Sequence, residues 1–159
     1  MYKILSIILI TLSLNVFAER VQLDNQAKSE ILKLYQGNER LHRAFFEYDI
    51  KKIETETKNV MKLMKAIKNE ELRTKFSLAL KMIKRIKASE KKEVNNKAYH
   101  VVSMALVNVL DKYDLGKTYN VYYCPMLKMK WVQNSLKHKG VENPYADYMP
   151  HCGRQFSKY

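Results

Sequence analysis

Residues 25–48, NQAKSEILKLYQGNERLHRAFFEY, carry the pattern on which the fold prediction rests. One set of side chains recurs at steps of three and four residues: Ile31, Leu34, Asn38, Leu41, Phe45 and Tyr48. This spacing places them on one stripe of an α-helix, so the stretch predicts an amphipathic helix. Asn38 is the amide within the stripe, and we expect it to set the packing register or to accept a hydrogen bond from a neighbouring helix.

The same alternation recurs in three further segments. Asp49 can cap the second helix, because its carboxylate can accept the free N–H groups of a first turn. Gly116 stands beyond the fourth segment, which runs from about Glu93 to Tyr113, as a stop signal. The stripes are Ile50, Ile53, Thr57, Val60, Met64 and Ile67; then Leu72, Phe76, Ala79, Ile83 and Ile86; then Ala98, Val102, Ala105 and Val109, with Leu106 and Leu110 beside them. Short connections and this spacing are typical of antiparallel bundles, so we predict an all-α, up-down four-helix bundle over residues 19–115.

Composition agrees with a single domain over residues 19–159. The chain has 159 residues, with only 4 Gly and 3 Pro, which argues against an all-β sandwich and its many tight turns. Residues 116–159 differ from the helices and are expected to form a strand and loop tail packed on the bundle. Alternation over residues 119–123 predicts a short strand, residues 131–138 a brief helix, and residues 140–159 a loop.

Residues 1–18 have the layout of a secretory signal peptide. Lys3 provides a positive start, an apolar run covers residues 4–14, and the small residues Val16 and Ala18 occupy the −3 and −1 positions. The run is shorter than the roughly 17–25 residues of a membrane span. We therefore predict a periplasmic or secreted protein, in a compartment where a disulfide can form.

The tail holds both cysteines, the single tryptophan and all three prolines. Its distinctive residues are Cys124-Pro125-Met126, Trp131, Asn143-Pro144-Tyr145, Met149 and Cys152-Gly153. Together they resemble the C-terminal signature of a bacterial envelope family, a domain of unknown function with a helical bundle. Members of that family also occur attached to the adaptor subunits of RND-type heavy-metal efflux systems. Ser103 corresponds to a serine of the family, whereas Ala146-Asp147 replace its aromatic-glycine pair.

The resemblance implies binding of copper or a similar soft metal, with a metal-efflux adaptor or another envelope protein as partner. Cu(I) prefers thiolate, thioether and imidazole ligands. The candidate metal ligands are Cys124, Met126, Met149, His151 and Cys152. We therefore expect a periplasmic copper-binding protein, a chaperone or buffer linked to metal efflux.

A structural disulfide is the competing interpretation of the two cysteines. A Cys124–Cys152 bond closes a loop of about 29 residues and contributes about 3–4 kcal/mol in the chain-entropy description. The disulfide and the metal site exclude each other at any instant, and a site that binds metal only when reduced is a third option. Methionines within the helices, Met61, Met64 and Met82, are assigned to packing.

The charge supports a second function. The net charge is +13, and residues 51–97 hold fifteen basic and six acidic residues. Lysine outnumbers arginine, 23 to 6, whereas nucleic-acid sites use arginine for bidentate contacts, so no nucleic-acid partner is expected. The alternative is a disulfide-stapled helical interaction module that binds an acidic envelope partner or an anionic membrane surface. A solvated helix face is the plainer explanation of the same charge.

Catalytic motifs are missing from the sequence. It contains no G-x-S-x-G, no phosphate-binding loop and no H-E-x-x-H, so we predict a binding protein and not an enzyme. A two-helix site from His42, His100 and Met104 is conceivable, but histidines at helix flanks are more often solvated or hydrogen-bonded.

Overall fold

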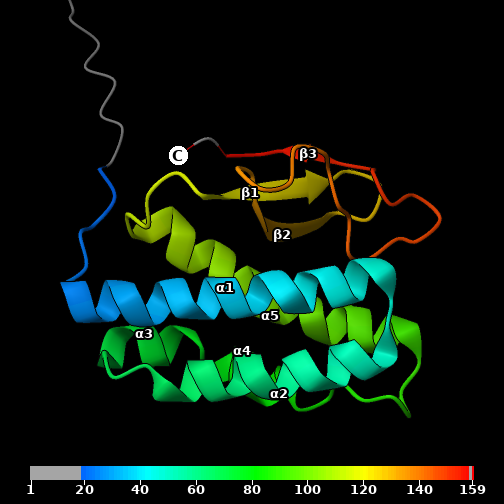
Figure 1. Ribbon diagram of the computed structural model, residues 1–159, viewed down its shortest axis with the longest axis horizontal. Helices are drawn as coiled ribbons and strands as arrows, with labels where there is room; N and C mark the ends of the chain where they lie inside the picture. Colours follow the sequence, from blue (N-terminus) through cyan, green and yellow to red (C-terminus); the bar gives the residue numbers. More distant parts are fainter. Residues whose placement is uncertain (1–18, 158) are drawn as a thin grey trace, which may run out of the picture.

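The computed structural model describes residues 19–157 and 159, so the predicted signal peptide lies outside the described residues. The helices are α1 (Asn25–Glu47), α2 (Ile50–Ala66), α3 (Glu70–Lys75), α4 (Ser77–Ile83) and α5 (Lys92–Lys112). The strands are β1 (Tyr119–Cys124), β2 (Met129–Asn134) and β3 (Arg154–Gln155). Figure 1 shows three tiers: α2, α3 and α4 on one side, α1 and α5 in the middle, and the sheet on the other side. In the described part, no helix has the length and apolar character needed to cross a membrane.

The prediction of an all-α four-helix bundle is wrong. The described residues form five helices and a three-stranded antiparallel sheet in the order β2-β1-β3. The third helical segment is divided at Phe76, whose backbone (φ −93°, ψ 0°) leaves helical geometry between α3 and α4. Phe76 and its stripe partners Leu72 and Ala79 are nevertheless fully buried. The spacing of apolar residues therefore predicted the core face correctly. It did not predict the break in the helix, because the spacing continues unchanged across Phe76.

The predicted helix boundaries of α1 and α2 are close to the observed ones. Asp24 caps α1 by accepting the Ala27 N–H at 2.8 Å. Tyr48 ends α1 in the left-handed conformation (φ 47°). Asp49 then caps α2 as predicted, accepting the Lys52 N–H at 3.1 Å.

The helical stripes meet in one core. Their buried apolar members come from all four predicted segments: Ile31, Leu34, Leu41, Phe45, Ile53, Val60, Met64, Ile67, Leu72, Phe76, Ala79, Ile83, Ile86, Ala98, Val102, Ala105, Leu106, Val109 and Leu110. Asn38 accepts a hydrogen bond from the Tyr99 hydroxyl at 3.2 Å, which confirms the expected role of this amide between helices. Tyr35 makes a second buried link from α1 to α5, donating to the Leu106 carbonyl oxygen at 2.6 Å.

The tail begins with a β-hairpin. β1 and β2 pair antiparallel from Tyr119↔Asn134 to Cys124↔Met129, and the turn contains Lys128 at φ 54°. The predicted helix over residues 131–138 is wrong, because its first half lies in β2. Pairing with β1 gives this segment its backbone hydrogen bonds, and the fully buried Trp131 ring stacks on Tyr122 at a centroid distance of 5.9 Å. Short β3 pairs with the other edge of β1.

Candidate functional site

The fold brings the two cysteines together. Cys124 is the last residue of β1 and is fully buried, and Cys152 stands two residues before β3. Pairing of Tyr123 with Arg154 carries Cys152 back to the end of β1. The two Sγ atoms lie 3.0 Å apart, and both cysteines are free. Residues 28 positions apart in the chain thus form a dithiol pair.

Asn143 positions the segment that carries Cys152. Its side-chain oxygen accepts the Tyr145 N–H at 3.0 Å, and its side-chain nitrogen donates to the Cys152 carbonyl oxygen at 3.0 Å. Its backbone N–H donates to the Pro150 carbonyl oxygen at 2.7 Å. One buried amide therefore folds the N-P-Y loop and holds the M-x-x-C-G segment against it.

Tyr145 ties the same loop to α5. Its hydroxyl is hydrogen-bonded to Ser103 Oγ at 2.9 Å and donates to the Lys130 carbonyl oxygen at 3.2 Å. The Asn96 side chain donates to the Tyr145 carbonyl oxygen at 3.1 Å. Burial raises the pKa of Tyr145 well above its ordinary value, so the phenol stays protonated. The signature residues of the tail thus build the scaffold of the thiol pair.

Gly153 is required beside Cys152 by the backbone and by packing. Its φ is +143°, a conformation that side chains rarely adopt. A Cβ there would lie 2.9 Å from the Trp131 ring and 3.1 Å from the Tyr123 carbonyl oxygen. The Cys-Gly pair therefore allows the chain to pass close over β1 and β2.

The surroundings of Cys152 favour its protonated thiol form. The hydrogen bond with Cys124, burial and the charge of a neighbouring thiolate raise the pKa of Cys152. A hydrogen bond from the Met126 backbone N–H acts in the opposite direction. A metal ion at this site would have to displace the Cys152 proton.

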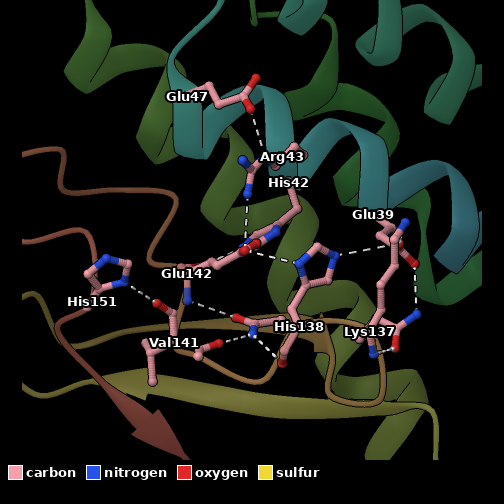
Figure 2. A network of polar contacts seen from close by, with 12 residues as sticks. Glu39, His42, Arg43, Glu47, Lys137, His138, Val141, Glu142 and His151 are labelled. Carbon is pink, nitrogen blue, oxygen red and sulfur yellow. Dashed lines mark hydrogen bonds and ion pairs between the residues drawn. The ribbon is translucent and has the colours of Figure 1, made fainter.

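The other three predicted ligands, Met126, Met149 and His151, lie near the thiol pair and differ in exposure and hydrogen bonding. Met126 belongs to the hairpin turn. Its backbone N–H is hydrogen-bonded to the Cys152 thiol, and the residue is 70% exposed. The Met149 carbonyl oxygen accepts the Cys152 N–H at 3.0 Å in a tight turn. His151 is exposed, and its Nδ1 donates to the Val141 carbonyl oxygen at 2.8 Å, which leaves the Nε2 lone pair available (Figure 2). Among residues 19–157 and 159, no group of three or more His, Cys, Asp or Glu side chains is arranged to hold a metal ion.

Met129 is a sulfur residue that the sequence analysis missed. It is the cross-strand partner of Cys124, so the two side chains leave the hairpin on the same face. The stacked pair Tyr122 and Trp131 stands on that face two residues further along each strand. Met129 is partly buried against the core, next to the thiol. Only the register of the hairpin could have revealed it, since Met129 lies outside the C-P-M element.

The two histidines that lie on helices, His42 and His100, both contact the tail. His42 is buried in α1, and its Nε2 donates to the Glu142 carbonyl oxygen at 2.8 Å. Burial lowers the pKa of His42 to about 4. His100 in α5 accepts the Lys130 N–H at 3.4 Å and meets the Tyr145 ring edge-on. Each ring has its own partner in the tail, which accounts for both without a metal.

A polar network fastens residues 134–142 to α1 (Figure 2). His138 lies between two carboxylates, with Nδ1 3.0 Å from Glu142 and Nε2 3.8 Å from Glu39. Arg43 pairs with Glu142 at 3.1 Å, and Lys137 with Glu39 at 2.6 Å. These contacts cross from α1 to the loop after β2 and hold the tail in place.

Comparison of the chain with protein-family models, curated proteins and solved structures found no match. The resemblance of the tail to the efflux-associated envelope family stays a prediction from the quoted motifs.

Proposed function

We propose that this protein binds Cu(I), or a comparably soft ion, through Cys124 and Cys152, and buffers or delivers it in the periplasm as part of metal efflux. The observation that carries the proposal is the 3.0 Å separation of the two sulfurs. Two thiols held together by a rigid hairpin and loop need little rearrangement to share one ion, which lowers the ordering cost of binding.

The donor chemistry of the surroundings fits a soft ion. Thiolates and thioethers are soft donors, which bind Cu(I) in preference to harder ions. Met129 stands across the strand pair from Cys124, and Met126 lies in the turn beside Cys152. Either thioether can supply a third sulfur to a two-thiolate site. Met149 and His151 lie on the turn before Cys152 and complete the set of candidate donors.

The test is a competition for Cu(I) between the reduced protein and a coloured chelator such as bicinchoninate. We expect the protein to take one Cu(I) per chain and to hold it at least about a hundredfold more tightly than the Cys124→Ser, Cys152→Ser double variant. Equal affinity of the two proteins would overturn the proposal. Loss of the thiols leaves the scaffold contacts of Asn143 and Tyr145 in place, so the double variant is expected to fold.

Methionine variants identify the third donor. Met126→Leu and Met129→Leu are compared with Met82→Leu, which changes a helix methionine packed against the core. Replacing a true ligand is expected to weaken Cu(I) binding by about tenfold, and the Met82 variant is expected to match the wild type.

The competing disulfide is tested by counting free thiols on protein isolated from the periplasm and unfolded without reductant. Two free thiols agree with a protected, metal-binding pair. No free thiol in a monomer identifies a Cys124–Cys152 bond, and Cu(I) binding then requires prior reduction.

A further inference from the structure

The outer side of the α2–α4 tier carries exposed basic side chains that lack acidic partners. In the described part of the chain, none of the following forms an ion pair: Lys51, Lys58, Lys62, Lys65, Lys81, Lys84, Arg85 and Lys87. We call these eight residues the basic face. Exposed lysines without partners keep their full charge available to a ligand.

Helix periodicity directs five of these charges away from the rest of the molecule, and Lys84, Arg85 and Lys87 follow directly after α4 as exposed residues. On α2, the positions of Lys51, Lys58, Lys62 and Lys65 lie opposite the buried stripe that contains Val60. On α4, Lys81 lies opposite the buried Ile83 and Ala79 stripe. Figure 1 places this tier on the far side of α1 and α5 from the sheet. The basic face and the thiol pair therefore lie on opposite sides of the protein.

One apolar side chain stands within this charged surface. Leu78 is 58% exposed and precedes Lys81 by three residues on α4, so the two share a helix face. If this surface meets a bilayer, its lysines contact the headgroups and the single apolar side chain of Leu78 can enter the interface.

We propose that the basic face is a docking surface for an anionic phospholipid bilayer, and that docking presents the thiol pair toward the aqueous side. Charge complementarity selects this occupant. The basic face is almost entirely lysine, whose compact ammonium acts as a point charge and suits a fluid layer of phosphates. An acidic protein surface with fixed carboxylates is better matched by the bidentate geometry of arginine, and Arg85 is the one arginine of this face.

The test is co-sedimentation of the purified protein with vesicles of phosphatidylcholine, alone or mixed with phosphatidylglycerol. We expect binding only to the mixed vesicles, and release at high salt because exposed charges are screened. Each charge removed near the surface is expected to weaken binding about fivefold, so a triple reversal Lys81→Glu, Lys84→Glu, Arg85→Glu weakens it by at least about a hundredfold. Leu78→Ser is expected to weaken it by about fivefold to tenfold.

The matched control reverses three exposed charges elsewhere, Lys117→Glu, Lys139→Glu and Arg154→Glu, which changes the net charge equally. We expect this variant to keep most of the binding. Equal loss in the two triple variants would overturn the proposal, because net charge alone would then explain binding. Failure of the wild type to bind mixed vesicles overturns it outright, as does stronger binding to soluble polyglutamate, which would point to an acidic protein partner.

Orientation has its own measurement, because Trp131 is the single tryptophan and lies in the sheet. Brominated lipids quench tryptophan fluorescence at short range. With the basic face on the bilayer, Trp131 fluorescence is expected to stay unquenched upon binding. Quenching would show that the sheet side docks instead. This proposal does not depend on metal binding, so the cysteine double variant is expected to bind vesicles like the wild type.

Discussion

The phenol oxygen of Tyr145 lies 2.9 Å from Ser103 Oγ, at the buried contact between the tail loop and α5. Both side chains are excluded from solvent. The same phenol reaches the Lys130 carbonyl oxygen in β2. One hydroxyl therefore joins three parts of the chain, and the loop that continues to Cys152 depends on it.

Replacing Tyr145 by Phe tests this link. The variant keeps the ring but leaves Ser103 Oγ without its phenol partner in a buried site. We expect the free energy of unfolding to fall by about 1–3 kcal/mol, measured by urea denaturation. The matched control is Tyr148→Phe. Tyr148 is 71% exposed, so removing its hydroxyl leaves no buried partner unsatisfied. A Tyr145→Phe protein as stable as the wild type would show that the link carries no net free energy.

Alanine at Gly153 and alanine at Gly140 are expected to change stability by different amounts. Gly153→Ala places a methyl group 2.9 Å from the Trp131 ring at a φ of +143°, so we expect a loss of about 2–4 kcal/mol in unfolding free energy. Gly140→Ala meets no atom within 4 Å and is expected to change stability by less than about 1 kcal/mol. Thermal or urea unfolding of the two variants measures the difference. Similar stability of both would contradict the packing described for Cys152-Gly153.

His42 predicts a pH dependence of stability. Its pKa is about 4 in the folded protein and about 6.5 when exposed, so the unfolded state binds a proton more readily. Stability is therefore expected to fall as pH decreases from about 6.5 toward 4, by up to about 3 kcal/mol from this group. His42→Gln keeps a donor for the Glu142 carbonyl oxygen but has no proton to gain, so its stability should vary less with pH.

The measurement is urea denaturation at several pH values between 7 and 4. His151→Gln is the control, because it makes the same substitution at an exposed histidine outside the buried contact with Glu142. If His42→Gln loses stability with falling pH as steeply as the wild type, burial of the imidazole is not the cause.

Cu(I) is expected to stabilise the reduced protein against unfolding. A ligand that binds only the folded state adds about 2.7 kcal/mol when its free concentration is a hundred times the dissociation constant. Thermal unfolding under anaerobic conditions, with buffered Cu(I), measures this gain, and excess chelator should reverse it. The Cys124→Ser, Cys152→Ser variant is expected to show no gain. Equal stabilisation of both proteins would place the ion elsewhere.

The helices were predictable because their signals are local. The stripe of α1 and the Asp49 cap each depend on residues within a few positions of one another. The same rules missed the break at Phe76, since both halves of the divided segment keep one buried face. They also assigned residues 131–138 to a helix, because a short segment of this kind adopts the structure that its strand partner imposes.

The candidate ligands were recognised by residue type, and their arrangement was not. The residues near Cys124 in the chain do not indicate that Cys152 lies beside it in the folded protein. Met129 lies beside Cys124 only because of the register between β1 and β2. The roles of Asn143 and Tyr145 in holding this loop are also contacts between distant segments.

The sequence by itself determined which residues face the core, where α1 and α2 begin, and which side chains offer soft donors, because helix period, capping and ligand chemistry belong to single segments. Only the tertiary structure decided that the tail forms a sheet, that the two sulfurs lie 3.0 Å apart, and that the basic face lies on the opposite side of the protein from them. Those outcomes depend on strand pairing and packing between segments far apart in the chain, whose free energies arise only when the whole core assembles.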